Sequence, residues 1–144
     1  MFEMFIEAEA GSCDKHDYDE KTMKYRGCRT AVAPFPYPYG FILGTLTEEE
    51  DGVDCYLITD ETPSAGSTVQ CEPVGLLEFF EGDETDHKVL AVPVNSREEI
   101  DARVRSTLEK FIYTIWTKFP DVQVRVGSLL PKQSALEYIE KYRT

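Results

Sequence analysis

The sequence predicts an α+β fold that is mainly β, a small barrel of short strands with helices flanking it toward the C-terminus. Short β-type runs, separated by glycine, proline and acidic turns, occupy residues 2–93. From residue 96 the apolar residues recur with the 3.6-residue period of a helix. A chain of 144 residues, 42% of them hydrophobic, is long enough to bury a core, so we expect one domain over residues 1–144.

The first part of the chain is predicted to be extended. Residues 2–9 partly alternate apolar with acidic side chains, which is typical of a half-exposed strand, and Gly11 follows its end. A short strand and turn over residues 14–19 and an extended segment over residues 23–32 come next. Residues 34–40 contain three prolines, which fix the backbone and exclude a helix, so we expect a rigid aromatic loop there.

Two acidic loops interrupt the later strands. The first, residues 48–54, carries five carboxylates in seven positions and leads into an apolar strand over residues 55–59. A β-type stretch over residues 68–80 leads into the second loop, residues 81–88, and a strand over residues 89–93 follows. Clustered carboxylates raise each other's pKa, whereas Mg²⁺ or Ca²⁺ binds them favourably. A metal site is therefore one interpretation of these loops, and a solvated acidic turn is the other.

The C-terminal part predicts two helices and a strand. The first helix should begin at Ser96 or Asn95 as N-cap, with Glu98 and Glu99 in its first turn. Its apolar stripe consists of Ile100, Val104, Leu108, Phe111, Ile112 and Ile115. Alternation over residues 121–126 predicts a last strand. The final helix should be capped by Ser134 and present Leu136, Ile139 and Tyr142.

Composition excludes several classes of function. The net charge is −12, from 27 acidic and 15 basic residues, which disfavours binding to nucleic acid or to anionic membranes. Four cysteines lie far apart without the spacing of a zinc site, so we expect reduced, structural thiols. No apolar run of about twenty residues and no secretory signal is evident, and the expected location is the cytoplasm.

Five segments match one pattern that extends over nearly the whole chain. They are Glu7–Asp19, Phe35–Ile42, Glu49–Asp54, the turn before Cys71–Gly75, and Glu81–Pro93. In this order and spacing they resemble the family I soluble inorganic pyrophosphatases, which hydrolyse pyrophosphate to two phosphates with Mg²⁺. The resemblance implies an OB-like five-stranded β-barrel and a cytoplasmic homo-oligomer, which is a hexamer in bacterial members.

The resemblance also implies roles for individual residues. The implied metal ligands are Glu49, Asp51, Asp54, Glu81 and Asp86, and Glu7 and Asp17 form an outer carboxylate shell. Phosphate binding falls to Lys15, Arg29, Tyr39, Lys88 and Lys118. Two Mg²⁺ ions held by such ligands could share a water and lower its pKa, with Asp51 accepting its proton or fixing it in place. The implied catalytic residues are Asp51, Tyr39, Lys15 and Lys88.

The chain departs from the family pattern at several carboxylate and cation positions. The family signature Asp-Gly-Asp-Pro-Leu-Asp falls on Glu49–Asp54, so glutamate replaces its first aspartate, as Glu81 does in the second loop. Each replacement moves a carboxylate outward by one methylene. The phosphate-binding arginine of the family is either Arg26 or Arg29, and Arg29 is favoured because it is nearer the aromatic loop.

Aromatic positions depart from the pattern as well. The first loop tyrosine of the family becomes Phe35 unless Tyr37 takes its place, and the late Tyr-Lys pair is absent, so Lys118 is the substitute for its lysine. These departures leave open a shifted phosphoanhydride preference. They also leave open a catalytically weak relative that binds divalent metal or a phosphorylated ligand without turnover. Nucleic-acid binding on an OB-like barrel is disfavoured by the charge of −12.

Overall fold

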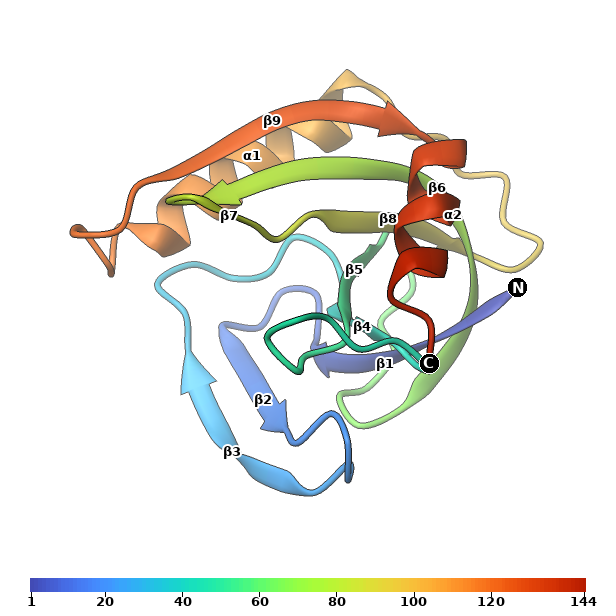
Figure 1. Cartoon of the computed structure of the whole chain (residues 1–144), viewed down its shortest axis with the longest axis horizontal. Helices are drawn as coiled ribbons and strands as arrows, with labels where there is room; N and C mark the ends of the chain where they lie inside the picture. Colours follow the sequence, from blue (N-terminus) through green and yellow to red (C-terminus); the bar gives the residue numbers. More distant parts are fainter.

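The computed structural model describes residues 1–144 as nine strands and two helices (Figure 1). The strands are β1 (Phe2–Ala8), β2 (Asp14–Tyr18), β3 (Tyr25–Thr30), β4 (Tyr39–Ile42), β5 (Val53–Leu57), β6 (Thr68–Glu81), β7 (Glu84–Thr85), β8 (Lys88–Pro93) and β9 (Val124–Pro131). The helices are α1 (Ala102–Trp116) and α2 (Lys132–Lys141). No helix in this chain has both the length and the apolar character needed to cross a membrane.

Five strands close into a ring, which confirms the predicted small barrel. The pairings run from β1 to β4, β5, β8 and β6, and β6 returns to pair with β1. Only the β5–β8 pair is parallel. The hairpin of β2 and β3 extends outward from β1, while β9 lies along the outer part of β6 (Figure 1).

Strand β6 pairs with several neighbours because it is long and bent. Its first residues pair with β1, and its later residues pair with β8 and β9. Its register shifts between Pro73 and Gly75, because proline cannot donate to the strand ladder. Strand β4 approaches β1 so closely that a Cβ at Gly40 would lie 1.8 Å from the carbonyl oxygen of Phe5. Glycine is therefore required directly after Tyr39.

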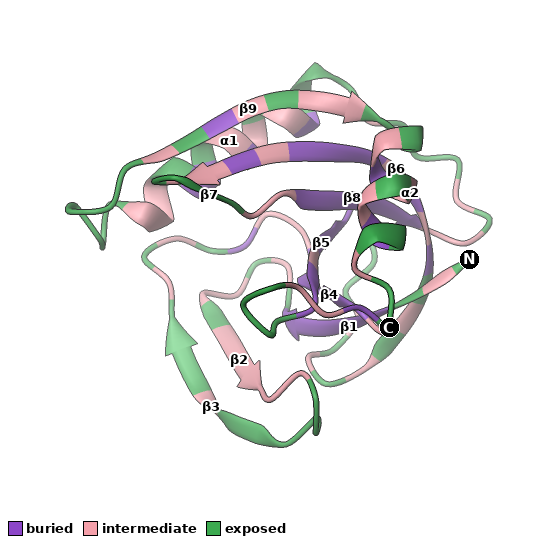
Figure 2. Ribbon diagram, in the orientation of Figure 1, coloured by how far each residue is buried: buried purple, intermediate pink, exposed green.

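Consecutive residues are buried along much of β1, β4, β5 and β8 (Figure 2). Along β5, Tyr56 packs in a cluster with α1, whereas Leu57 packs in a second cluster with α2. Successive strand residues point to opposite faces, so α1 packs against one face of the barrel wall and α2 packs against the other. The buried residues of α1 are Val104, Leu108, Phe111 and Ile112, which lie on the predicted stripe. By contrast, most of β2 and β3 is half-exposed or exposed (Figure 2).

Both predicted helix starts are wrong. Helix α1 begins at Ala102, and its N-cap is Asp101, whose side chain accepts hydrogen bonds from the amides of Arg103 and Val104. The hydroxyl of Ser96 instead accepts a hydrogen bond from the Glu98 amide in a turn outside the helix, so Glu98 and Glu99 are not in its first turn.

The C-terminal boundaries also differ from the prediction. Strand β9 continues to Pro131 because it pairs with β6 along its length, and it does not end at Val126. Helix α2 follows it directly with Pro131 as N-cap, so Ser134 lies inside the helix and does not cap it. Tyr39 belongs to β4 rather than to the preceding aromatic loop.

Candidate active site

Two adjoining cavities lie where the β2–β3 hairpin meets the barrel. The carboxylate cavity, about 350 Å³, is lined by five acids, Glu7, Asp17, Glu20, Asp51 and Asp54, together with Lys15, Arg26, Arg29 and Tyr18. The aromatic cavity, about 410 Å³, has the polar lining residues Lys15, Arg29, Lys88, Lys118, Glu81, Asp86, Tyr39, Tyr56 and Thr30. Lys15 and Arg29 line both cavities, so these two cations stand between the acids and the aromatic space.

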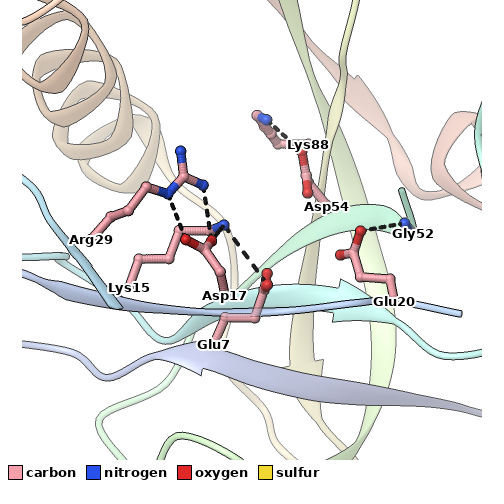
Figure 3. Close-up of polar contacts among 8 residues, drawn as sticks. All are labelled: Glu7, Lys15, Asp17, Glu20, Arg29, Gly52, Asp54 and Lys88. Atoms are coloured by element: carbon pink, nitrogen blue, oxygen red, sulfur yellow. Dashed lines mark hydrogen bonds and ion pairs between the residues drawn. The ribbon is translucent and has the colours of Figure 1, made fainter. Parts of the chain in front are cut away.

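Strand register places the two shared cations side by side. Lys15 on β2 lies directly opposite Arg29 on β3, so both side chains leave the hairpin on one face. Asp17, two residues after Lys15, shares that face because side chains alternate along a strand. Figure 3 shows the three side chains converging above Glu7 of β1.

Asp17 holds both cations. Its Oδ2 accepts a hydrogen bond from Arg29 Nε at 2.7 Å, and its Oδ1 accepts from Arg29 Nη2 and Lys15 Nζ, both at 2.9 Å. Lys15 Nζ also lies 3.7 Å from Glu7 Oε2. Partial burial raises the pKa of Asp17, but the hydrogen bonds from Arg29 and Lys15 outweigh it and lower that pKa. Asp17 is therefore the acceptor that orients the two cations.

Two acids of the carboxylate cavity hold protons more tightly than an ordinary carboxylate. Glu7 is 3% exposed, and burial raises its pKa to about 7, with Lys15 opposing and Asp54 adding to the rise. Burial also raises the pKa of Glu20 to about 9, helped by the Glu7 charge and by hydrogen bonding with Asp51. Bringing these acids together costs free energy unless protons or a cation neutralise them.

Glu20 is a site residue that the sequence analysis missed. It follows β2 and reaches the first acidic loop, where its Oε2 accepts a hydrogen bond from the Gly52 amide at 3.0 Å (Figure 3). The family signature has proline at the position of Gly52, and proline has no amide hydrogen to donate. A side chain at Gly52 would also meet the Phe41 ring at 2.7 Å. Gly52, at the proline position of the family signature, was therefore the sign in the sequence that this loop donates a hydrogen bond to a new partner.

Lys88 neutralises a second pair of acids. Its Nζ donates to Asp54 Oδ2 at 2.7 Å and to Asp86 Oδ2 at 2.9 Å. Burial raises the pKa of Asp54 to about 6 despite the Lys88 charge. For Asp86, the effect of burial is outweighed by Lys88, so its pKa is lowered. Burial alone would lower the pKa of Lys88, but Asp54, Tyr39 and Asp86 raise it well above its usual value, so the lysine stays charged.

The predicted metal ligands fall into three places. Asp51 and Asp54 line the carboxylate cavity, Glu81 and Asp86 line the aromatic cavity, and Glu49 lines neither. Glu49 is exposed and accepts a hydrogen bond from the Thr47 hydroxyl at 3.4 Å. Nowhere do three or more Asp, Glu, His or Cys side chains converge as a ready metal site.

The chemistry of the carboxylate cavity nevertheless fits a hard divalent cation. Its acidic lining offers only oxygen ligands, and burial together with neighbouring acids raises the pKa of Glu7 and of Glu20. Mg²⁺ keeps several of its waters and is commonly held through one or two carboxylates, so it does not require a compact cage. Asp51 and Asp54 are the residues placed to hold it, with Glu7 and Glu20 beside them.

The predicted phosphate-binding residues all line the aromatic cavity. Lys15, Arg29, Tyr39, Lys88 and Lys118 all contribute to its wall. The Tyr39 ring stacks on Phe35 with ring centroids 5.6 Å apart. Arg26 lines only the carboxylate cavity and pairs with Asp19, which leaves Arg29 as the arginine in contact with both spaces. Phe35 lines the aromatic cavity and Tyr37 does not, so no tyrosine replaces the first loop tyrosine there.

Two further residues of the aromatic cavity went unrecognised in the sequence. Tyr56 is 2% exposed and packs against Tyr39 with ring centroids 4.7 Å apart. Trp116, the last residue of α1, also lines the cavity. Tyr56 lies in the apolar strand predicted over residues 55–59, and Trp116 directly follows the last residue of the predicted stripe. Periodicity marks neither as a cavity residue, because a helix or strand that borders a cavity has the same apolar pattern as one that borders the core.

Known proteins resemble this chain along most of its length. The family model described as inorganic pyrophosphatase matches residues 4–143. The inorganic pyrophosphatase of Nanoarchaeum equitans is 33% identical over 105 residues, covering 73% of this chain and 66% of that protein. That alignment therefore spans slightly less than two thirds of the relative's length.

Two other proteins are matched over more of their length. The inorganic pyrophosphatase of Halalkalibacterium halodurans is 30% identical over 151 residues, covering 98% of this chain and 92% of that protein. The structure of the Helicobacter pylori inorganic pyrophosphatase superposes with a TM-score of 0.85 at 25% identity, covering 97% of this chain and 89% of that one. With a family match over nearly every residue and the same fold, this chain belongs to the inorganic pyrophosphatase family.

Proposed function

We propose that this protein is an inorganic diphosphatase that hydrolyses pyrophosphate to two phosphates with Mg²⁺ as its metal ion. Family membership supports the reaction, and one feature of the site carries the proposal. Lys15 and Arg29 line both the carboxylate cavity and the aromatic cavity. An anion held by these cations would touch the space where a divalent metal fits, which is what metal-assisted phosphoryl transfer requires.

The residues of the chain divide the work of binding between them. Lys15 and Arg29 would contact the phosphoryl oxygens from the hairpin side, held in position by Asp17. Tyr39 and Lys118 would contact the same anion from the aromatic cavity. Lys88 forms ion pairs with Asp54 and Asp86, so its main role is to neutralise these two acids next to the bound anion. Several weak contacts of this kind fix an anion more firmly than one cation does.

Hydrolysis requires a water aligned with the bond that breaks. The water oxygen attacks one phosphorus, the bridging P–O bond breaks, and the bridging oxygen leaves with the second phosphate. Bound Mg²⁺ would supply positive charge to the phosphates and make a nearby water more acidic. We assign the proton of the attacking water to Asp51, which lines the carboxylate cavity together with Lys15 and Arg29. Glu20, which lines the same cavity and accepts a hydrogen bond from the Gly52 amide next to Asp51, would help to position that carboxyl.

The remaining expectations stay predictions. These are a cytoplasmic location, a homo-oligomer that would be a hexamer by resemblance, ligation of metal by Glu49 and Glu81, and a single domain over residues 1–144. To ligate a metal there, Glu49 would have to turn toward the cavities from its exposed position.

A phosphate-release assay tests the proposed function. Purified protein with pyrophosphate and Mg²⁺ should release phosphate between pH 6 and 9, and excess EDTA should stop the release. Binding of the non-hydrolysable analogue methylenediphosphonate would be measured in the same buffer by calorimetry. Release at the level of the buffer blank together with tight analogue binding would overturn the enzyme assignment and support the alternative, a binding protein without turnover.

A further inference from the structure

The aromatic cavity has an apolar half that a purely inorganic substrate does not need. Its apolar wall is formed by Ala31, Phe35, Ile115, Trp116, Phe119 and Val122. Ile115 and Trp116 end α1, Phe119 and Val122 lie in the following turn, and Ala31 and Phe35 face them from the segment between β3 and β4. Pyrophosphate exposes only oxygen atoms, so contact with this wall would remove water from charged oxygens without replacing their hydrogen bonds.

The apolar wall is partly open to solvent. Phe119 is 48% exposed and Val122 is 38% exposed, although both line the cavity. The Trp116 ring is fixed between Phe79 and Phe119, with ring centroids 5.8 Å and 5.6 Å away. Covering an anchored aromatic ring and its exposed apolar neighbours with an apolar group is favourable, because it removes apolar surface from water.

Positively charged residues of the same cavity restrict the kind of ligand that can cover the apolar wall. Four cations, Lys15, Arg29, Lys88 and Lys118, line the same cavity and outnumber its two acids, Glu81 and Asp86. The Nζ of Lys118 lies 3.4 Å from the Thr30 carbonyl oxygen. A ligand that fills the whole space must therefore be anionic at one end and apolar at the other. The volume of about 410 Å³ lies within the range of roughly 300–1,000 Å³ that is usual for small-molecule sites.

We infer that the aromatic cavity accepts organic diphosphate monoesters whose alcohol group is aromatic or otherwise apolar, an inference that rests on the proposed function. The two phosphoryl groups lie against Lys15 and Arg29, and the organic group covers Trp116 and Phe119. A nucleobase fits less well, because the apolar wall offers hardly any polar group to meet the donors and acceptors on its edge.

Turnover of such an ester is the same reaction with a different leaving group. Water attacks the terminal phosphorus, the bridging P–O bond breaks, and the products are orthophosphate and the organic monophosphate, which keeps the bridging oxygen. No oxidant, reductant or further reactant is needed. The terminal phosphoryl group must face the carboxylate cavity, which is the orientation that leaves the organic group on the apolar wall.

Binding is tested with two non-hydrolysable analogues, the monophenyl and monomethyl esters of methylenediphosphonate, in buffer with Mg²⁺. Trp116 is the only tryptophan of the chain, so its fluorescence reports directly on the wall. We expect the phenyl ester to change that fluorescence and to bind at least about tenfold more tightly than the methyl ester. Equal dissociation constants for the two esters would overturn the inference.

A variant pair locates the effect on the apolar wall. Phe119→Ala should reduce the phenyl-over-methyl binding ratio about fivefold to tenfold, because it removes apolar area that the phenyl group covers. Val32→Ala is the matched control, since Val32 is 55% exposed near the same segment but does not line the cavity, and its ratio should stay unchanged. A ratio that Phe119→Ala leaves unchanged would contradict the assignment of the wall.

The outcomes separate this inference from the proposed function. If the phenyl ester binds preferentially but neither pyrophosphate nor phenyl diphosphate is hydrolysed, the ligand class is supported and the diphosphatase function fails. If pyrophosphate is hydrolysed but the esters bind equally, the function holds and the inference fails. Equal binding with Trp116 shielded from acrylamide quenching only in concentrated protein would assign the wall to a contact between two copies of the chain.

Discussion

Replacing Glu7 with glutamine should stabilise the metal-free protein at high pH. Glu7 is 3% exposed, and its pKa is raised from 4.5 to about 7 because burial disfavours its charge. A carboxyl whose pKa is higher in the folded state binds more protons than in the unfolded state. Its contribution to stability is complete below pH 4.5 and is lost as the pH rises through about 7.

The size of the effect follows from the two pKa values. At about 1.4 kcal/mol per pH unit, the difference between 4.5 and about 7 corresponds to about 3 kcal/mol lost by the wild type at pH 8. Glu7→Gln keeps the shape of the side chain and does not ionise. We therefore expect the variant to gain up to about 3 kcal/mol over the wild type at pH 8 and little at pH 4.5.

Urea unfolding in EDTA at pH 4.5 and pH 8 measures this difference. With a urea dependence of roughly 2 kcal/mol per M, the midpoint at pH 8 should rise by about 1 M or more. Glu3→Gln is the matched control, because Glu3 lies on the same strand but is exposed, and it should leave the pH dependence as in the wild type. Added Mg²⁺ should stabilise Glu7→Gln less than the wild type.

The reasoning fails if Glu7→Gln unfolds at the same urea concentration as the wild type at pH 8. It also fails if the variant loses as much stability between pH 4.5 and pH 8 as Glu3→Gln does. Either result would mean that Glu7 keeps its charge in the folded protein with solvent or Lys15 compensating fully, so that the carboxylate cavity carries no excess of negative charge.

Three other substitutions separate binding, catalysis and folding. Lys88→Met should destabilise the protein by about 3–5 kcal/mol in urea at pH 8, since two acids lose their shared cation, and a loss below about 1 kcal/mol would contradict that role. Asp51→Asn should lower turnover about 10³-fold or more without lowering apo stability, with exposed Asp83→Asn as control; activity within tenfold of wild type would make Asp51 dispensable. Glu20→Gln should weaken Mn²⁺ binding about tenfold in calorimetry while the fold is kept, and an unchanged dissociation constant would remove Glu20 from the site.

The barrel was predictable because its signals are local. Strands β1, β2, β3, β5, β6 and β8 follow runs of β-type residues bounded by turns, and the stripe of α1 repeats at the helical period. By contrast, β4 begins in the predicted aromatic loop, and β7 lies in the second acidic loop. The helix starts were not predictable in the same way. Ser96 and Asp101 are both good N-caps in sequence, and only the packing of α1 against the barrel selects Asp101.

The site shows the same division between local and tertiary information. Family motifs brought Lys15, Asp51 and Asp54 together, and Arg29 was favoured over Arg26 by its nearness to the aromatic loop. The structure places all four residues at one pair of cavities. Glu20 escaped notice because its partner is the Gly52 amide, 32 residues away in the chain.

Two other features of the site also depend on contacts between residues that are far apart in the sequence. Only the strand pairing shows that Lys88 reaches Asp54 across the β5–β8 pair. The apolar wall that includes Trp116 depends on how the end of α1 faces the segment after β3, which no sequence period reveals.

A crystal structure with Mn²⁺ and methylenediphosphonate tests most directly whether the two cavities form one site for metal and diphosphate. Anomalous scattering from Mn²⁺ locates the ions without ambiguity. We predict at least one ion bound to Asp51 or Asp54 in the carboxylate cavity, with the analogue lying against Lys15 and Arg29. Ions bound only to the exposed acids of residues 48–50, or an analogue bound away from both cations, would contradict the account.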